Sequence, residues 1–348
     1  MNELRVFFLL VVPAGVLSGV LTFFIRAIAL RLRIFDIPSP RKIHTRPVPT
    51  TGGLAIAAGF WLALAGGYPF VPAAWRLPPP LAVGLGAASI LVVILGIGDD
   101  LFDWGAWFKL FAQAGIAAIL VFSGFQINLI SLPFGGSMAV GIAGIFLTML
   151  WIVGMMNAIN LLDGLDGLAA GVSAIALLFL FCADVRTGMM PAAVLSITLT
   201  GALLGFLVWN FHPAKIFMGN TGSMFLGMIM AVVAIVGAQK STAVFTLFVP
   251  VLAMAIPILD TSLSIVRRLS TGRPVFKADG DHMHHRLLKV HQSQRHVVIS
   301  LYFITCCYGL IAASFTGMKG VFGWLALVVV TLVTFRWLRN WGFLDFKK

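Results

Sequence analysis

Long apolar runs, separated by short polar segments, are the feature that most constrains the fold of this chain. A helix that spans the hydrocarbon core of a bilayer needs about 20 mostly apolar residues. We therefore expect an all-α, polytopic membrane protein of about eleven transmembrane helices, forming a single domain over residues 1–348. The expected spans lie near residues 6–28, 52–70, 81–98, 108–124, 139–156, 167–183, 190–209, 222–238, 243–263, 297–315 and 320–338.

Composition excludes the soluble alternatives. Hydrophobic residues make up 60% of the chain and charged residues only 10%, against about 25% charged residues in an average soluble domain. The formal net charge of +12 does not indicate a nucleic-acid partner, because the charges fall in short segments between apolar runs. The first apolar run is too long for a signal peptide and lacks a clear small-residue cleavage site, so we expect it to remain as the first helix.

Lysine and arginine gather in alternate loops, which predicts the orientation of the protein. They are concentrated in the C-terminal tail, at residues 31–46 and 267–295, and at Lys109 and Lys215. The loops at 29–51, 99–107, 157–166, 210–221 and 266–296 are therefore predicted to share one face. Positively charged loops stay on the cytoplasmic side of the membrane. We therefore expect a multi-pass protein of the cytoplasmic (inner) membrane, with the N-terminus outside and the C-terminus inside.

The acidic residues follow the same division, although orientation depends little on them. Of the 12 acidic residues, only Glu3 and Asp184 fall on the outer side. Carboxylates at the ends of membrane helices are costly and usually functional. Their distribution predicts a single active face on the cytoplasmic side.

The first chemical motif is Gly-Asp-Asp-Leu-Phe-Asp at residues 98–103, where the third expected span ends. Adjacent carboxylates repel each other unless a cation lies near them. Such a group can hold Mg²⁺, or one acid can act as a base while another steers the metal. A solvated acidic loop is the alternative that this motif alone leaves open.

The second motif places two asparagines and two aspartates within residues 157–166. Asn157 and Asn160 share one helix face, and Asp163 and Asp166 repeat the same spacing. The glycines that follow each aspartate permit a turn and the close approach of a ligand to the backbone. A helix cap explains one of these aspartates but not all four polar residues, so a functional site is favoured.

Three further motifs are weaker when each is taken alone. Residues 217–223 open the eighth expected span and suit an anion at a helix start, although an ordinary cap by Asn220 or Thr221 explains them at least as well. Residues 282–285 are His-Met-His-His in a basic segment; we expect them to face phosphates, with acidic lipid head groups as the alternative. Residues 36–53 are expected to form an ordered basic loop that enters the second span, although positive-inside charge alone also explains their composition.

Together, and in this order, the five motifs resemble the polyprenyl-phosphate N-acetylhexosamine-1-phosphate transferase family. The resemblance extends from about Asp36 to Leu288. The third aspartate of residues 98–103, Pro-Ile-Leu-Asp at 257–260, the segment 267–276 and His-Met-His-His at 282–285 are similar to the branch that transfers GlcNAc 1-phosphate from UDP-GlcNAc to undecaprenyl phosphate.

The resemblance implies transfer of an N-acetylhexosamine 1-phosphate, with GlcNAc favoured, from a UDP-sugar to undecaprenyl phosphate as the first membrane step of cell-envelope polysaccharide synthesis. UMP is the expected by-product, Mg²⁺ the expected cofactor with Mn²⁺ as the alternative, and a homodimer is left open. Phospho-MurNAc-pentapeptide and deoxyhexosamine 1-phosphate remain alternative transferred groups. A membrane transporter is the rival from another class, although transporter sites lie near the bilayer midplane.

The resemblance also assigns roles to residues. The expected catalytic residues are Asp99, Asp100 and Asp163, with Asp99 favoured for activating the lipid phosphate. The expected metal ligands are Asp99, Asp100, Asp163 and Asn220. The expected substrate-binding residues are Lys109, Asn157, Asn160, Asp166, Phe217 (against the uracil ring), Arg268, Arg273, His282, His284 and His285. Asn220 departs from the family, which usually has aspartate there; an amide oxygen can ligate Mg²⁺ but carries no charge.

Overall fold

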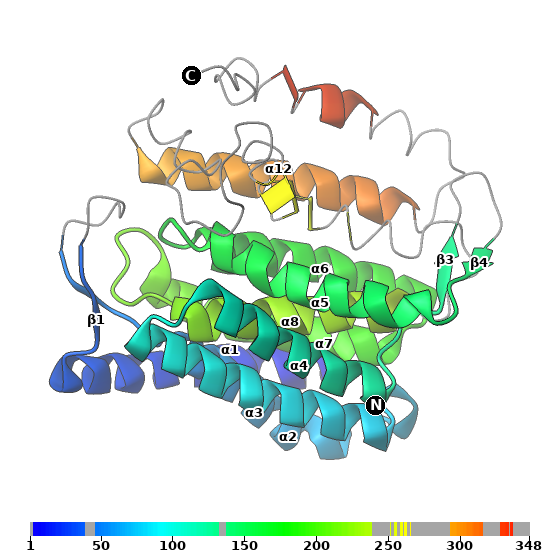
Figure 1. The fold of residues 1–348 in the computed structure, drawn as a ribbon, viewed down its shortest axis with the longest axis horizontal. Coiled ribbons are helices and arrows are strands. Elements are labelled where there is room, and N and C mark those ends of the chain that lie inside the picture. The colour runs from blue at the N-terminus through cyan, green and yellow to red at the C-terminus, as the bar shows by residue number, and fades with distance from the viewer. Residues whose placement is uncertain are drawn as a thin grey trace.

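Nine helices of membrane-spanning length and hydropathy lie in the part of the chain that the structure describes. The structure is a computed structural model (Figure 1). It describes residues 3–38, 46–131, 137–238, 251, 254–255, 258–259, 261–262, 265, 293–315, 328–333 and 335–336. The long helices are α1 (Glu3–Leu32), α2 (Gly53–Gly67), α3 (Pro79–Phe102), α4 (Ala106–Ser123), α5 (Ala143–Leu162), α6 (Leu168–Thr187), α7 (Met190–Asn210), α8 (Gly219–Ala238) and α12 (Gln294–Phe315).

The few strands form two short antiparallel hairpins within the described residues. One hairpin pairs β1 (Phe35–Asp36) with β2 (Val48–Pro49), and the other pairs β3 (Leu129–Ser131) with β4 (Ser137–Ala139). Two 3₁₀ helices, Tyr68–Phe70 and Ala73–Trp75, follow α2. The expected all-α, polytopic fold is confirmed, and nine of the expected spans correspond to these helices. The expected spans at 243–263 and 320–338 lie mostly outside the described residues.

Helix α8 is the centre of the bundle. Every residue from Thr221 to Val236 is buried, and α8 packs against α2, α3, α5, α6 and α7. Glycines permit this close packing: a Cβ on Gly96 of α3 would clash with the backbone of Thr221, and one on Gly227 of α8 with the backbone of α5. Small residues at such crossings are typical of helix packing in membranes. The position of α8 therefore fixes the positions of its neighbours.

The polar loops gather at one end of the bundle, which we call the inner end. There α3 and α5 end, α6 and α8 begin, and the β1–β2 hairpin lies beside them, whereas β3 and β4 lie at the opposite end (Figure 1). The described parts of the loops that the sequence predicts to share one face are thus brought together. The segment 266–292 lies outside the described residues.

The orientation of this inner end can be measured with an impermeant thiol reagent. In a protein whose Cys182, Cys306 and Cys307 are replaced by alanine, Lys215→Cys should react only after the membrane is permeabilised. Ala74→Cys, which is also exposed but lies in the loop after α2, should react in intact cells, because positively charged loops remain cytoplasmic. Labelling of Lys215→Cys in intact cells would contradict a cytoplasmic inner end.

Candidate active site

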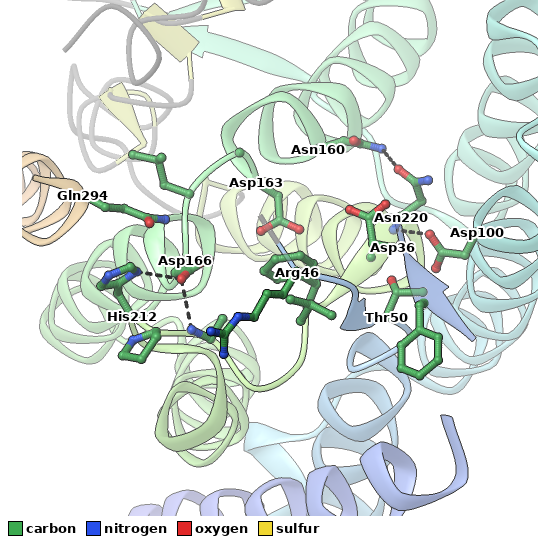
Figure 2. Close-up of a pocket in the computed structure, with 18 of the residues that line it drawn as sticks. Asp36, Arg46, Thr50, Asp100, Asn160, Asp163, Asp166, His212, Asn220 and Gln294 are labelled. Atoms are coloured by element: carbon green, nitrogen blue, oxygen red, sulfur yellow. Dashed lines mark hydrogen bonds and ion pairs between the residues drawn. The ribbon is translucent and has the colours of Figure 1, made fainter. Parts of the chain in front are cut away.

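An open pocket of about 800 Å³ lies at the inner end (Figure 2). Its walls come from segments that are distant in sequence: the β1–β2 hairpin, the end of α3, the turn between α5 and α6, and the loop between α7 and α8. The polar residues that line it are Asp36, Arg46, Thr50, Asp99, Asp100, Asp103, Asn160, Asp163, Asp166, His212, Asn220 and Gln294. Carboxylates, amides and two basic side chains therefore face one cavity.

Asp99 is held from two directions at the end of α3. Its side chain accepts hydrogen bonds from the backbone N–H of Trp104 at 3.0 Å and from Nζ of Lys109 at 3.1 Å. Asp99 is 2% exposed, whereas 27% of the Lys109 side chain is exposed. Gly98 is required beneath this turn, since a Cβ there would clash with the ring of Trp104. Lys109, expected to meet a phosphate, lies in an ion pair that leaves part of its side chain accessible.

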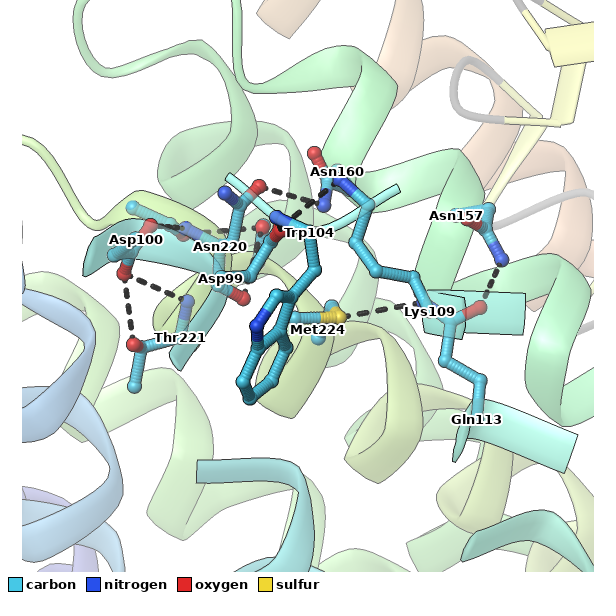
Figure 3. A network of polar contacts seen from close by, with 12 residues as sticks. Asp99, Asp100, Trp104, Lys109, Gln113, Asn157, Asn160, Asn220, Thr221 and Met224 are labelled. Carbon is cyan, nitrogen blue, oxygen red and sulfur yellow. Dashed lines mark hydrogen bonds and ion pairs between the residues drawn. The ribbon is translucent and has the colours of Figure 1, made fainter. Parts of the chain in front are cut away.

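Asp100 points to a different partner, the N-terminus of α8 (Figure 3). Its Oδ1 accepts the backbone N–H of Asn220 at 2.7 Å, and its Oδ2 accepts the backbone N–H and the hydroxyl of Thr221 at 3.2 and 2.8 Å. The first N–H groups of a helix have no partner within the helix, and a carboxylate there also interacts favourably with the helix dipole. Asp100 is therefore a cap supplied by α3, which favours a positioning role over direct metal ligation.

This cap corrects one sequence-based interpretation. The alternative explanation of residues 217–223 was a cap by the side chain of Asn220 or Thr221, and neither side chain has that role here. The start of α8 does bind an anion, and that anion is the carboxylate of Asp100.

The two asparagines of α5 have separate environments (Figure 3). Nδ2 of Asn160 donates to Oδ1 of Asn220 at 2.9 Å, and both residues line the pocket. Asn157 is not among the residues that line the pocket: its Nδ2 donates to Oε1 of Gln113 at 2.6 Å, and Gln113 donates to the sulfur of Met224 at 3.2 Å. The structure therefore places Asn160 in the site and Asn157 at the partly buried end of a polar connection between α4, α5 and α8.

Asp163 lies between the two sides of the pocket (Figure 2). Burial and, after it, the negative charges of Asp100, Asp166 and Asp36 raise the pKa of Asp163 to about 8. A carboxyl group in such surroundings is stabilised in its charged form by a nearby cation. The position suits a positively charged ligand or a metal ion.

The side chains around Asp163 can be compared with the ligands that Mg²⁺ prefers. Among the described residues, no three His, Cys, Asp or Glu side chains are arranged to hold a metal ion. Mg²⁺ is usually bound by one or two carboxylates, with water and substrate phosphates completing its shell. Asp163 and the amides of Asn160 and Asn220 are oxygen ligands of the right type for such a partial site.

Asp166 holds the loop between α7 and α8. Its Oδ2 lies 2.8 Å from Nδ1 of His212 and accepts the backbone N–H of Ala214 at 3.0 Å. Sequence reasoning missed His212, because a single histidine in a loop has no informative spacing and its partner lies 46 residues earlier. It also did not assign Arg46, Thr50 or Gln294 to the site.

Phe217 lines the pocket and joins two of the motifs. Its backbone N–H donates to the carbonyl of Pro49 at 2.9 Å, and its carbonyl accepts the N–H of Gly52 at 2.9 Å. The basic loop before α2 and the segment before α8 are therefore one structural unit. The remaining expected residues, Arg268, Arg273, His282, His284 and His285, lie outside the described residues.

Comparison with known proteins decides the family. The model of the family described as "Glycosyl transferase family 4" matches residues 82–238. A protein of Bacillus subtilis named "Probable undecaprenyl-phosphate N-acetylglucosaminyl 1-phosphate transferase" is 36% identical over 315 residues, which cover 90% of this chain and 85% of the relative. The chain belongs to glycosyl transferase family 4.

Two further relatives widen this comparison. The "Decaprenyl-phosphate N-acetylglucosaminephosphotransferase" of Mycobacterium tuberculosis is 36% identical over 321 residues, covering 83% of this chain and 78% of the relative. The "Undecaprenyl-phosphate alpha-N-acetylglucosaminyl 1-phosphate transferase" of Escherichia coli is 26% identical over 319 residues, covering 90% of this chain and 85% of the relative. A family 4 transferase is an enzyme, so the transporter alternative finds no support.

In this family 4 transferase, the two adjacent aspartates should respond differently to mutation. Asp99→Asn should lower turnover by at least ~10² with a small effect on melting temperature, as expected for a group that acts on the substrate. Asp100→Asn should lower the free energy of unfolding by about 2 kcal/mol, because it replaces the anionic cap of α8. Turnover and thermal unfolding of the purified variants measure both effects.

Glu3→Gln is the control for these substitutions. Glu3 is exposed at the start of α1, so the same acid-to-amide change should alter neither property. Asp184 is a poor control, since it is buried, with Oδ2 3.5 Å from the hydroxyl of Ser196. Equal stability losses in Asp99→Asn and Asp100→Asn would contradict the division of roles.

Proposed function

We propose that this family 4 transferase moves GlcNAc 1-phosphate from UDP-GlcNAc to undecaprenyl phosphate and releases UMP at the cytoplasmic face of the inner membrane. The observation that carries the proposal is the Asp99–Lys109 pair, placed where a membrane helix ends and opening onto an acidic pocket. A phosphate on a membrane lipid reaches this depth, while a water-soluble nucleotide sugar enters the open pocket. The names of the three relatives support GlcNAc as the sugar and a polyprenyl phosphate as the acceptor.

In the proposed reaction, an oxygen of the lipid phosphate attacks the β-phosphorus of UDP-GlcNAc. A new P–O bond forms to that phosphorus, and its bond to the oxygen shared with the α-phosphate breaks, so that UMP leaves. Lys109 attracts the lipid phosphate, and Asp99 accepts its proton when the phosphate arrives protonated. A single displacement is favoured over an aspartyl-phosphate intermediate, because it needs only one phosphoryl transfer between two phosphate substrates held side by side.

Charge neutralisation and positioning are the main catalytic contributions in phosphoryl transfer. Bound Mg²⁺, with Mn²⁺ as the alternative, would neutralise the charge of the diphosphate. Asp163, Asn160 and Asn220 are the residues proposed to hold it, while Asp100 keeps Asn220 in place through its backbone N–H.

Incubation of the purified protein with undecaprenyl phosphate and a panel of UDP-sugars tests the proposed function. UDP-GlcNAc should give UMP and a lipid product whose mass corresponds to added GlcNAc and phosphate. UDP-MurNAc-pentapeptide and UDP-deoxyhexosamines should give little product. Asp163→Asn should lower UMP release by at least ~10². Release of UMP from another sugar nucleotide in preference to UDP-GlcNAc would reassign the substrate, and no UMP from any of them would refute the proposal.

Asn220→Asp tests the metal site. A charged ligand binds a hard cation more strongly than an amide does, so the substitution should lower the Mg²⁺ concentration for half-maximal activity and raise turnover. One charged ligand is worth ~2 kcal/mol, or roughly thirtyfold in affinity. Asn160 can still donate to the new carboxylate, and the backbone N–H of residue 220 remains available to Asp100.

A second measurement separates metal binding from a structural effect. Without metal, the new carboxylate lies near Asp100 and should lower the melting temperature; with Mg²⁺ the melting temperature should recover. If Asn220 has no contact with the metal, the magnesium titrations of the two proteins superimpose at equal turnover.

A further inference from the structure

His212 lies in a loop that is fixed at several points. Its ring bonds to Asp166, and its backbone carbonyl accepts hydrogen bonds from Nε and Nη2 of Arg295 at 3.3 and 3.1 Å. Asn210, two residues earlier, accepts the backbone N–H of Gly167 at 3.1 Å and donates to the carbonyl of Ile216 at 2.9 Å. The imidazole is therefore attached to a frame formed by α6, α7 and α12.

The contact with Asp166 determines which ring nitrogen is available. An ionised carboxylate only accepts hydrogen bonds, so Nδ1 of His212 carries the proton. Nε2 is then left for another partner, and among the described residues no group is hydrogen-bonded to it. The His212 side chain is 35% exposed and lines the pocket, whereas that of Asp166 is 14% exposed. A histidine oriented by a carboxylate through one nitrogen commonly acts through the other.

The place of His212 in the pocket indicates its ligand. Asp99 and Lys109 lie beside Asn160 and Asn220 (Figure 3). Those two amides lie across the pocket from His212, with Asp163 between them (Figure 2). In an in-line displacement, the attacking and leaving oxygens lie on opposite sides of the phosphorus. A lipid phosphate at Asp99 and Lys109 therefore directs the leaving UMP toward His212.

We propose that His212, with its ring oriented by Asp166, binds the nucleotide half of the UDP-sugar through Nε2. The inference rests on the proposed function for the direction of the reaction. Its ligand, UMP, is common to every UDP-sugar, so the inference does not depend on which sugar is transferred. The alternative is a purely structural role, called a latch below, in which His212 only holds its loop to Asp166 through Nδ1 and Nε2 binds nothing.

Two substitutions separate these roles. The amide nitrogen of asparagine occupies nearly the position of Nδ1, so His212→Asn keeps the donor to Asp166 and removes Nε2. The terminal amide of glutamine reaches nearly the position of Nε2 and can present either its oxygen or its nitrogen there. His212→Gln therefore keeps a hydrogen-bonding group at that place and loses the contact with Asp166. His296→Asn is the matched control, because His296 is exposed in the first turn of α12.

The experiment measures UMP affinity by calorimetry on the purified variants, together with KM for both substrates. His212→Asn should weaken UMP binding and raise KM for UDP-GlcNAc by about tenfold, the effect of one lost hydrogen bond to a ligand. It should leave the melting temperature and KM for undecaprenyl phosphate unchanged. His212→Gln should bind UMP more tightly than His212→Asn, although it should melt at a lower temperature.

Normal UMP affinity in His212→Asn, or UMP affinity in His212→Gln no better than in His212→Asn, would overturn the inference and leave His212 as a latch. If the wild-type protein binds UMP but releases none from UDP-GlcNAc, the proposed function fails while the titrations still test His212.

Discussion

The hydrogen bonds between the carboxylate of Asp100 and the N-terminus of α8 are the interaction on which the rest of the inner end depends. Helix α8 is buried from Thr221 onward, and the backbone N–H of Thr221 is one of the groups that this carboxylate accepts. Unsatisfied backbone groups are expensive in such surroundings. The carboxylate of Asp100 accepts hydrogen bonds from these groups and so joins the end of α3 to the start of α8.

The junction between α3 and α8 determines the geometry of the pocket. Asp99 precedes Asp100, so the position of the Asp99–Lys109 pair relative to Asn220 follows from the cap. Asn220 in turn accepts a hydrogen bond from Asn160, which fixes the end of α5 and hence Asp163. The Asp166–His212 contact closes the other side of the pocket by joining the start of α6 to the loop before α8. Asp100 and Asp166 thus mainly hold other parts of the protein in place, while Asp99 and Asp163 are the residues proposed to act on the substrates and the metal ion.

The sequence predicted those features that depend on local patterns. Hydropathy located the helices because each span must be apolar along its length, and the polar motifs were recognised because related residues recur at helical spacing. Pairings over long separations were not predictable in this way: Asp100 contacts Asn220 across 120 residues, and His212 contacts Asp166 across 46. Adjacent aspartates on a helix also point in directions roughly 100° apart, so the motif could not indicate that Asp99 and Asp100 have different partners. The separation of Asn157 from the pocket has a similar cause, since Gln113 is its partner on another helix.

A cryo-electron microscopy structure of the protein with UDP-GlcNAc and Mg²⁺ would test the central claim most directly. The account predicts density for the diphosphate and a metal ion between Asp163 and Asn220, with the uridine directed toward His212 and the open side of the β-phosphorus facing Asp99. Density for the nucleotide sugar outside this pocket, or a uridine placed against Asp99 and Lys109, would contradict it.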